Sequence, residues 1–338
     1  MWTAAALGAG VLAALSAPVP ASAATSSSGC SSSPQPPPPS RFTATVEVDG
    51  VQRSALVNVP PQARPHVPLP LMLAFHGAGG NGPATESSTG LTQAADSAGF
   101  ITVYPNADGT FWRYLPGDPR GTRDVTFVRL LLDQLDAVLC VADNRVYATG
   151  GSNGAGFVSV LGCRLNDRLS AIAPVAGIYR PQPGCPPSRP LSVLEIHGTN
   201  DGTAPYDGSM TAGTFGVTSF LDEWFQWDSC ASGPPVYRRL GRWALWLAKS
   251  GCADGTTVAH IKLIGEPHAW PLASRAAHAA PSRAAHAART VAFDASRAIV
   301  HFFQTETVAT VAPRYRRRHG ARARQPRRPS STGGAVSG

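Results

Sequence analysis

The sequence has few charged residues and lacks the cysteine spacing of a zinc or redox site. Charged residues make up 15% of its 338 positions, whereas hydrophobic residues make up 43%. This balance excludes a disordered protein or a coiled coil, and the length allows one large domain with a sizeable core. None of the six cysteines stands in a Cys-x-x-Cys pair. We therefore predict neither a bound metal nor a cofactor.

Acidic residues are absent from the last 25 positions, which contain eight arginines. These are Arg314, Arg316, Arg317, Arg318, Arg322, Arg324, Arg327 and Arg328. The formal net charge of the whole chain is +8, so the remaining residues together are neutral. A neutral body gives no reason to predict nucleic-acid binding. Residues 313–338 lack apolar spacing, and we expect a disordered tail, solvated or in contact with an anionic polymer.

Long apolar runs are absent after the start of the chain. Residues 3–20 are uncharged and rich in Ala, Leu and Val, and a small-residue cleavage site follows at positions 21–23. We therefore predict a signal peptide at residues 1–23 and a secreted, extracellular protein. The run contains two prolines and is too short for a stable membrane span. All six cysteines follow it, and an even count in an exported chain predicts three disulfides.

Apolar runs of strand length alternate with helical patterns through the middle of the chain. These segments are 42–48, 71–75, 101–104, 125–139, 146–150, 191–197, 258–264 and 292–303. The alternation predicts an α/β domain over residues 42–304, with a mostly parallel central sheet and helices on both faces. Residues 24–41 are rich in Ser and Pro and are predicted to be a linker. Residues 274–288 repeat Ser-Arg-Ala-Ala-His-Ala-Ala and are predicted to be a surface insertion.

Ser152 lies between glycines in the motif Gly150-Gly151-Ser152-Asn153-Gly154. A predicted strand precedes the motif and a helical pattern follows it, which is typical of a nucleophile at a strained strand-to-helix turn. Glycine is needed on both sides because the turn brings the backbone close to neighbouring strands. The alternative is an ordinary strand-to-helix loop, and the motif alone does not decide between the two.

Asp201 and His268 follow two later predicted strands. Asp201 comes just after 191–197 and His268 just after 258–264, so each falls at the carboxyl edge of the sheet. Serine, aspartate and histidine in this order are typical of an α/β-hydrolase. Ser152 would be the nucleophile, His268 the general base and Asp201 its orienting acid. Asp207 and Asp222 remain lesser candidates for the acid.

Backbone N–H groups near Ser152 are candidates for an oxyanion hole. Asn153 directly follows the nucleophile, and the second donor should come from the loop after 71–75. We assign it to Ala78, with Gly77 as the near alternative. Residues 77–82 also match the dinucleotide-binding pattern Gly-x-Gly-x-x-Gly. That pattern requires an acid near the end of the next strand, and residues 99–105 contain none.

Five stretches carry a closer resemblance: residues 73–80, 143–154, 173–177, 197–206 and 268–271. In these motifs and their order, the chain resembles secreted feruloyl esterases and the polyhydroxybutyrate-depolymerase-like esterases. The resemblance implies an α/β-hydrolase fold and the triad Ser152, Asp201 and His268. It also implies the disulfides Cys30–Cys140, Cys163–Cys185 and Cys230–Cys252. The chain departs from the family at Glu266-Pro267, which replaces a glycine pair, in the repeat, and in lacking vicinal cysteines near Trp112.

Two tryptophans are expected in loops beside the site. Trp112 and Trp270 are candidates for stacking on an aromatic or sugar ester, with packing as the alternative. We therefore predict a secreted serine esterase, most simply a feruloyl esterase that releases hydroxycinnamates from plant xylan through an acyl-enzyme. A polyhydroxybutyrate depolymerase or an acetylxylan esterase would use the same triad. A hydrolase-shaped protein that binds polymer without catalysis is the remaining alternative.

Overall fold

A computed structural model describes most of the chain. The described residues are 26–31, 39–115, 118–181, 187–249, 251–273 and 293–306. The predicted signal peptide (1–23), the repeat insertion (274–288), the tail (313–338) and Cys185 lie outside them.

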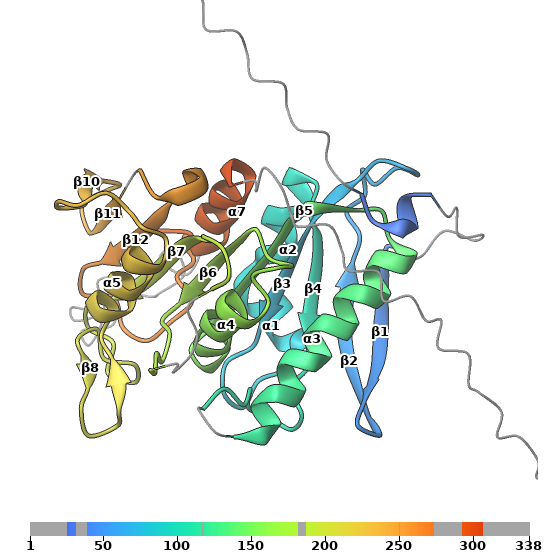
Figure 1. The fold of residues 1–338 in the computed structure, drawn as a ribbon, viewed down its shortest axis with the longest axis horizontal. Helices are drawn as coiled ribbons and strands as arrows, with labels where there is room; N and C mark the ends of the chain where they lie inside the picture. The colour runs from blue at the N-terminus through green and yellow to red at the C-terminus, as the bar shows by residue number, and fades with distance from the viewer. Residues whose placement is uncertain are drawn as a thin grey trace, which may run out of the picture.

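A sheet of 10 strands forms the centre of the molecule (Figure 1), in the order β1-β2-β4-β3-β5-β6-β7-β12-β11-β10. The strands are β1 Arg41–Val48, β2 Val51–Asn58, β3 Leu69–Phe75, β4 Ile101–Pro105, β5 Val141–Gly151, β6 Ala171–Val175, β7 Ser192–Gly198, β10 Val236–Arg239, β11 Ala244–Lys249 and β12 Val258–Leu263. The run from β4 to β12 is parallel throughout, and antiparallel hairpins extend both ends. The strands β8 Gly208–Ser209 and β9 Thr214–Phe215 form a separate short hairpin.

Helices cover both faces of this sheet, as the alternating pattern predicts. They are α1 Gly82–Thr89, α2 Leu91–Ala98, α3 Pro119–Val138, α4 Asn153–Arg164, α5 Val217–Trp227 and α7 Ala295–Thr305, with short 3-10 turns at η1 Ser28–Cys30 and η2 Ala253–Gly255. Buried residues of α3, α4 and α5 pack on one face, and those of α2 and α7 on the other. Successive residues of β3 point to opposite faces of the sheet: Leu73 packs on the side of α3, α4 and α5, and Ala74 on the side of α2 and α7. Among the described helices, none is long and apolar enough to cross a membrane.

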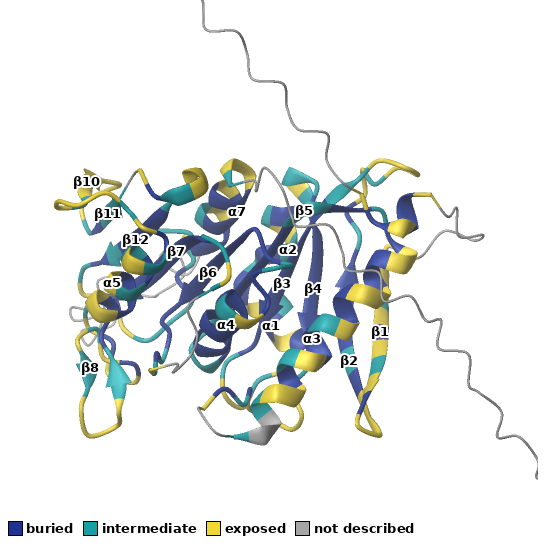
Figure 2. Ribbon diagram, in the orientation of Figure 1, coloured by how far each residue is buried: buried dark blue, intermediate teal, exposed yellow. Residues whose placement is uncertain are grey.

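Burial explains several of the strands that the sequence pattern finds. Strands β3, β4 and β7 are buried on both faces (Figure 2), so they stand out as continuous apolar runs. The segments of β2, β6, β10 and β11 are not in the predicted set, although β6 is fully buried. Every residue of β10 is exposed, and all of β11 except Ala244 is only partly buried. A strand without a buried face leaves no period-two pattern to detect.

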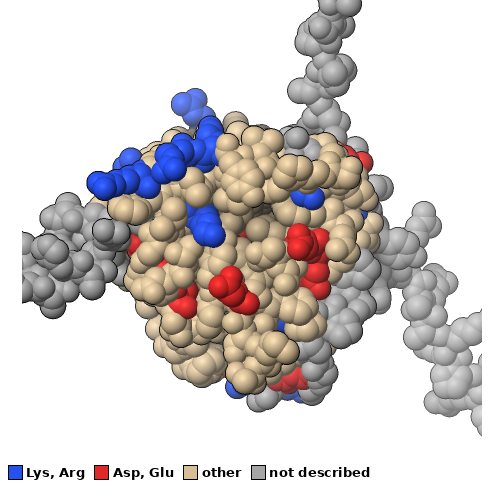
Figure 3. Space-filling view, turned by 90° about the vertical axis from the view of Figure 1, so that its left-hand side faces the viewer, with Lys and Arg blue, Asp and Glu red and all other residues tan. Residues whose placement is uncertain are grey.

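Positive charge gathers where the sheet ends. We call residues 236–249, which form β10, β11 and their turn, the basic hairpin. It contains Arg238, Arg239, Arg242 and Lys249 and no acidic residue. Figure 3 shows the end of the molecule where this hairpin lies, with Lys and Arg side chains gathered along its upper margin.

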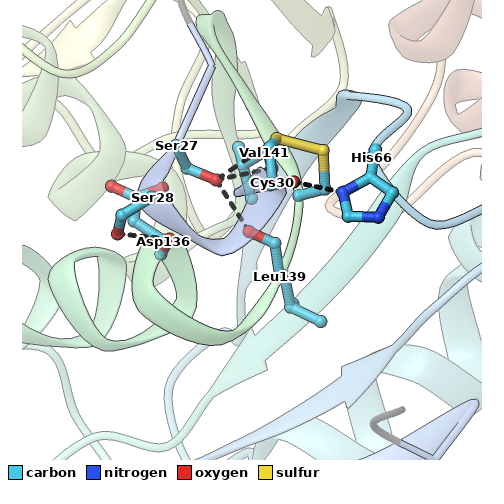
Figure 4. Close-up of a disulfide and its surroundings, with 8 residues drawn as sticks. Ser27, Ser28, Cys30, His66, Asp136, Leu139 and Val141 are labelled. Carbon is cyan, nitrogen blue, oxygen red and sulfur yellow. Dashed lines mark hydrogen bonds between the residues drawn. A yellow bond between two sulfur atoms is a disulfide. The ribbon is translucent and has the colours of Figure 1, made fainter. Parts of the chain in front are cut away.

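The N-terminal part of the predicted linker packs onto the domain. Ser27 and Cys30 are buried, and Cys30 forms a disulfide with Cys140 (Figure 4). The Ser27 hydroxyl donates to the carbonyl of Leu139 at 2.7 Å and accepts from the N–H of Val141 at 2.9 Å. Residues 26–31 thus belong to the folded body, unlike the expectation of a linker over 24–41, because polar backbone and one disulfide hold them where an apolar pattern is missing.

Two of the disulfides implied by the family resemblance are confirmed. These are Cys30–Cys140, with a sequence separation of 110, and Cys230–Cys252, with a separation of 22. The partner expected for Cys163, Cys185, lies outside the described residues.

We expect the loss of the longer-range disulfide to destabilise the domain more. A crosslink restricts the unfolded chain by an amount that rises with the logarithm of the length of the loop it closes, so replacing Cys30 and Cys140 by serine should cost about 5 kcal/mol of unfolding free energy. Replacing Cys230 and Cys252 by serine should cost about 1 kcal/mol less. Urea unfolding of both double variants, compared with the oxidised parent, measures the two losses. An equal or larger loss in the Cys230–Cys252 variant would contradict this account.

Candidate active site

Ser152 lies at the sharp turn between β5 and α4, in a strained backbone conformation. Its φ is 56° and its ψ −117°, a combination that few non-glycine residues adopt. The N–H of Ser152 donates to the carbonyl of Val175 at 3.0 Å, and the N–H of Gly156 donates to the carbonyl of Ser152 at 3.1 Å. These bonds to β6 and α4 hold the turn. The hydroxyl thereby stands where β5 ends and the helix begins.

The two flanking glycines of the motif are required by close backbone packing. A Cβ atom on Gly150 would lie 2.9 Å from the carbonyl oxygen of Phe75 on the neighbouring strand. A Cβ atom on Gly154 would collide with the carbonyl oxygens of Phe75 and His76. The sequence argument for glycine at these positions therefore agrees with the packing of β3 against the start of α4.

Asp201 and His268 form a hydrogen-bonded pair, as the order of the motifs predicts. His268 Nδ1 donates to Asp201 Oδ2 at 2.7 Å. The other oxygen of the carboxylate, Oδ1, accepts the N–H groups of Thr203 at 2.9 Å and Ala204 at 2.7 Å. The lesser candidates Asp207 and Asp222 are exposed. Asp201 is therefore the carboxylate that can orient His268.

The loop after β12 reaches this position although Glu266-Pro267 replaces the glycine pair of the family. The N–H of Asn200 donates to the carbonyl of Glu266 at 3.0 Å, and the N–H of Gly265 donates to Thr199 Oγ1 at 2.8 Å. These bonds tie the His268 loop to the loop that carries Asp201. Backbone contacts between the two loops place His268 without the glycines.

Ser152 and His268 line one cavity of about 170 Å³. Its walls include Phe75, Gly77 and Trp270. The Trp270 indole N–H donates to Ser296 Oγ of α7 at 2.9 Å, which fixes the ring at the cavity wall. In the described part of the chain, no group of His, Cys, Asp and Glu side chains is arranged to hold a metal ion.

Trp112 does not line the cavity, which corrects the prediction that it offers a stacking surface. Its side chain is only 2% exposed and stacks on Phe157 at a centroid distance of 4.9 Å. The indole N–H donates to the carbonyl of His76 at 3.1 Å. The backbone of Trp112 also forms a reciprocal pair with the Asn153 side chain, at 2.8 Å and 3.2 Å. Trp112 packs beneath the site because its large apolar ring fills the core between β3 and α4.

The loop after β3 holds one peptide group in a fixed orientation. The carbonyl of Gly77 accepts from His76 Nδ1 at 2.8 Å and from the N–H of Gly80 at 3.1 Å. His76 Nε2 accepts the N–H of Ala107 at 3.1 Å, and burial lowers the pKa of this histidine, so its ring is neutral. A trans peptide places its N–H opposite its carbonyl. The Ala78 N–H therefore points away from His76 and Gly80.

The N–H of Asn153 is the other predicted oxyanion donor. Asn153 is the first residue of α4, and the first N–H groups of a helix have no partner within the helix. Gly77 lies beside Ser152, since a Cβ atom there would be 3.4 Å from Ser152 Cβ. Of the three residues predicted for the oxyanion hole, Gly77 thus approaches Ser152 from the loop after β3 and Asn153 follows it at the start of α4, while Ala78 directly follows Gly77.

A buried cation lies behind Asp201. His197 Nδ1 is 2.9 Å from Glu195 Oε1, and its Nε2 is 2.8 Å from the carbonyl of Ala204 and 3.3 Å from Asp201 Oδ2. All three partners are acceptors, so both ring nitrogens must carry protons. Burial opposes this charge, but Glu195 and the hydrogen bonds to Asp201, Glu195 and Ala204 outweigh it and raise the pKa of His197 to about 10.

Glu195 is the fully buried counter-ion of this cation. Its Oε1 accepts from the Tyr179 hydroxyl at 2.8 Å, and its Oε2 lies 2.6 Å from His260 Nδ1. Burial alone would raise the pKa of Glu195, but His197 and His260 outweigh it and lower the pKa to about 2. The same competition holds at Asp201, where hydrogen bonds from His197, His268 and Ala204 outweigh burial and lower the pKa. The charged groups between β7 and His268 therefore alternate in sign: the Glu195 carboxylate, the His197 cation and the Asp201 carboxylate.

Glu195 and His197 are absent from the sequence-predicted site, although one signal was present. A glutamate and a histidine two positions apart stand inside the apolar run 191–197, and His260 stands inside the run 258–264. Polar residues in a strand buried on both faces must find partners there. In the parallel pair of β7 and β12, His260 lies in register with Glu195.

Comparison with known proteins supports this description of the fold. No protein-family model matches the chain. NocK of Nocardia uniformis subsp. tsuyamanensis, which carries the name of an esterase, is 32% identical over 62% of this chain and 64% of its own length. The bifunctional acetylxylan esterase/xylanase XynS20E of Neocallimastix patriciarum is 28% identical over 65% of this chain and 31% of its own. Feruloyl esterase B of Piromyces equi is 27% identical over 54% of this chain and 37% of its own length.

These alignments are partial, and the chain spans less than two thirds of the length of each of these relatives. Among solved structures, the acetyl xylan esterase from Aspergillus awamori matches with a TM-score of 0.54 and 14% identity, over 67% of this chain and 94% of the other. That likeness shows the α/β-hydrolase fold. The chain therefore has an α/β-hydrolase fold and is similar, over part of its length, to proteins that are named as esterases.

Proposed function

We propose that the protein is a serine carboxylic-ester hydrolase with Ser152, His268 and Asp201 as its catalytic triad. The observation that carries the proposal is that Ser152, at a strained turn, and His268, hydrogen-bonded to a buried Asp201, line the same cavity. Three strand ends that are far apart in sequence supply these residues in the α/β-hydrolase order. The relatives named as esterases support the same chemistry.

The geometry suggests the following two-step reaction. Ser152 Oγ attacks the ester carbonyl carbon while His268 Nε2 takes its proton, and the N–H groups of Asn153 and Ala78 receive the developing oxyanion. The tetrahedral intermediate expels the alcohol, which takes the proton from His268, and leaves an acyl-enzyme. Water then attacks the acyl carbon with His268 as base, and the acid and free Ser152 are released. Asp201 keeps the His268 proton on Nδ1 and stabilises the imidazolium.

We assign the substrate class as esters of plant xylan, with feruloyl esters first. Feruloyl esterase B and the acetylxylan esterase/xylanase among the relatives support this class. The indole of Trp270 at the cavity wall offers an aromatic acyl group a stacking surface. Acetyl esters are the second candidate because the cavity, at about 170 Å³, is small beside the pockets that hold drug-sized ligands.

We further propose that the protein acts outside the cell. Its disulfides Cys30–Cys140 and Cys230–Cys252 are bonds that persist in oxidising compartments. The apolar start of the sequence, with its small-residue cleavage site, supports the same location. A polymeric substrate such as plant xylan also requires an extracellular enzyme.

Replacing Ser152 by alanine should abolish ester hydrolysis. Without the nucleophile, release of ferulate from methyl ferulate should fall by at least about a thousandfold, since the triad acts as a unit. The matched control is Ser97→Ala, an exposed serine on α2 that should keep full activity. Liquid chromatography of released ferulate measures both.

A fluorophosphonate probe, which reacts with activated serines, separates mechanism from acyl preference. Labelling of the wild type but not of Ser152→Ala, without ferulate release, would move the assignment to acetyl esters. Equal ferulate release by the wild type and Ser152→Ala would overturn the proposal.

Removing the buried cation should weaken catalysis more than binding. In His197→Asn, we expect kcat to fall roughly tenfold to a hundredfold with KM for methyl ferulate little changed, because Asp201 loses a donor that orients it. Steady-state kinetics of methyl ferulate hydrolysis measure both constants.

A second variant separates this positioning role from simple destabilisation. His197→Asn leaves Glu195 without its main counter-charge, whereas adding Glu195→Gln removes the unpaired charge and should recover stability. The loss of kcat should persist in the double variant. Return of kcat to the wild-type value would show that His197 acts through stability alone. His301→Asn, at an exposed position on α7, is the control.

A further inference from the structure

The cations of the basic hairpin lack the acidic partners that other surface arginines have. Elsewhere, Arg41 pairs with Glu86 and Arg129 with Asp167. Within the described residues, Arg238, Arg239, Arg242 and Lys249 form no ion pair with an acid, nor does Lys262 on the adjacent β12. Arg239 makes only a long hydrogen bond, 3.4 Å, to the carbonyl of Arg242. These charges are therefore available to an anion from outside.

Aromatic rings hold these cations in place. The Arg238 guanidinium lies 5.8 Å from the Trp246 ring, and that of Arg242 lies 5.0 Å from Trp243. On β12, Lys262 Nζ lies 4.7 Å from the centroid of the Tyr206 ring. A ring face attracts a cation but carries no net negative charge, so the contact leaves the charge of the cation uncompensated. The rings thereby pre-organise the donors without neutralising them.

The hairpin also exposes apolar surface. Val236 is 66% exposed, Tyr237 63% and Leu240 40%. Charged residues on the edge strands of many proteins have no role except to prevent pairing with other chains. A strand built for that purpose has no reason to present a tyrosine and two aliphatic side chains beside its charges. Together they form a mixed surface of cations and rings on an uncovered sheet edge (Figures 2 and 3).

We infer that the basic hairpin is a docking surface for an acidic polysaccharide, a xylan that carries uronic acid groups. Guanidinium groups bind carboxylates through paired N–H donors, and the exposed ring of Tyr237 offers an apolar face to a sugar ring. The described body contains no broad excess of positive charge of the kind that nucleic acid requires. This inference rests on the proposed function for the identity of the polymer. It places the hairpin outside the cavity, so its role would be to hold the substrate chain.

Affinity electrophoresis of the full chain in gels containing glucuronoxylan tests the docking surface. Arg238→Gln with Arg239→Gln should weaken retention about fivefold or more, and added salt should reduce the wild-type retention towards that of the variant. Tyr237→Ser should weaken retention on both glucuronoxylan and neutral arabinoxylan. The matched control, Arg64→Gln with Arg297→Gln, removes two exposed arginines elsewhere and should leave retention unchanged. The arginine-rich tail is present in every variant and contributes equally.

Three results would overturn the inference. Unchanged retention of the Arg238/Arg239 variant would show that the hairpin does not bind the polymer. An equal loss on neutral arabinoxylan would show that carboxylates are not what the arginines recognise. Duplex DNA competing as well as a polyuronate would assign the surface to polyanions in general.

Turnover of methyl ferulate, measured on the same samples, keeps this test separate from the proposed function. Hairpin variants should hydrolyse the small ester normally, because none of their side chains lines the cavity. Normal turnover with unchanged retention would count against the docking surface alone. A wild type without turnover would count against the proposed function.

Discussion

The imidazolium of His197, enclosed between the carboxylates of Glu195 and Asp201, is the interaction on which the site depends. Two carboxylates buried this close together would carry a large desolvation cost without a cation between them. In the proposed mechanism Asp201 must be ionised to orient His268, although its side chain is fully buried. His197 on β7, together with the donors of His268, Thr203 and Ala204, stabilises that buried carboxylate.

Strand register connects this charge arrangement to the fold. The parallel pairing of β7 with β12 sets His260 opposite Glu195, and the loops that leave the two strands carry Asp201 and His268. On the other side of the site, close packing of β3 against Gly150 and Gly154 sets the distance between the His76 loop and Ser152. The core therefore positions the reactive groups through backbone contacts, and the loops need only short tethers to complete the site.

The sequence is most informative where burial and chemistry impose a pattern. The doubly buried strands appear as apolar runs, and the motifs that end them predict which serine, aspartate and histidine meet. The same reasoning misplaces Trp112, because a loop tryptophan near a motif reads the same whether its ring faces a cavity or the core. It also leaves out β2, β6, β11 and the exposed β10, which shows no apolar period. The partners of Asp201 are missed as well, because they depend on which strands pair. Those features arise from three-dimensional neighbours that a linear pattern does not contain.

The loop after β12 and the helix α7 are joined near the cavity by a hydrogen bond between residues far apart in sequence. The N–H of Ala295 donates to the carbonyl of Pro271 at 3.0 Å, directly beside Trp270. This hydrogen bond holds together the residues on either side of the stretch 274–292, so the loop is closed at its base. Lengthening a closed loop costs little additional entropy. The length of this stretch can therefore change in evolution while the wall of the cavity keeps its shape.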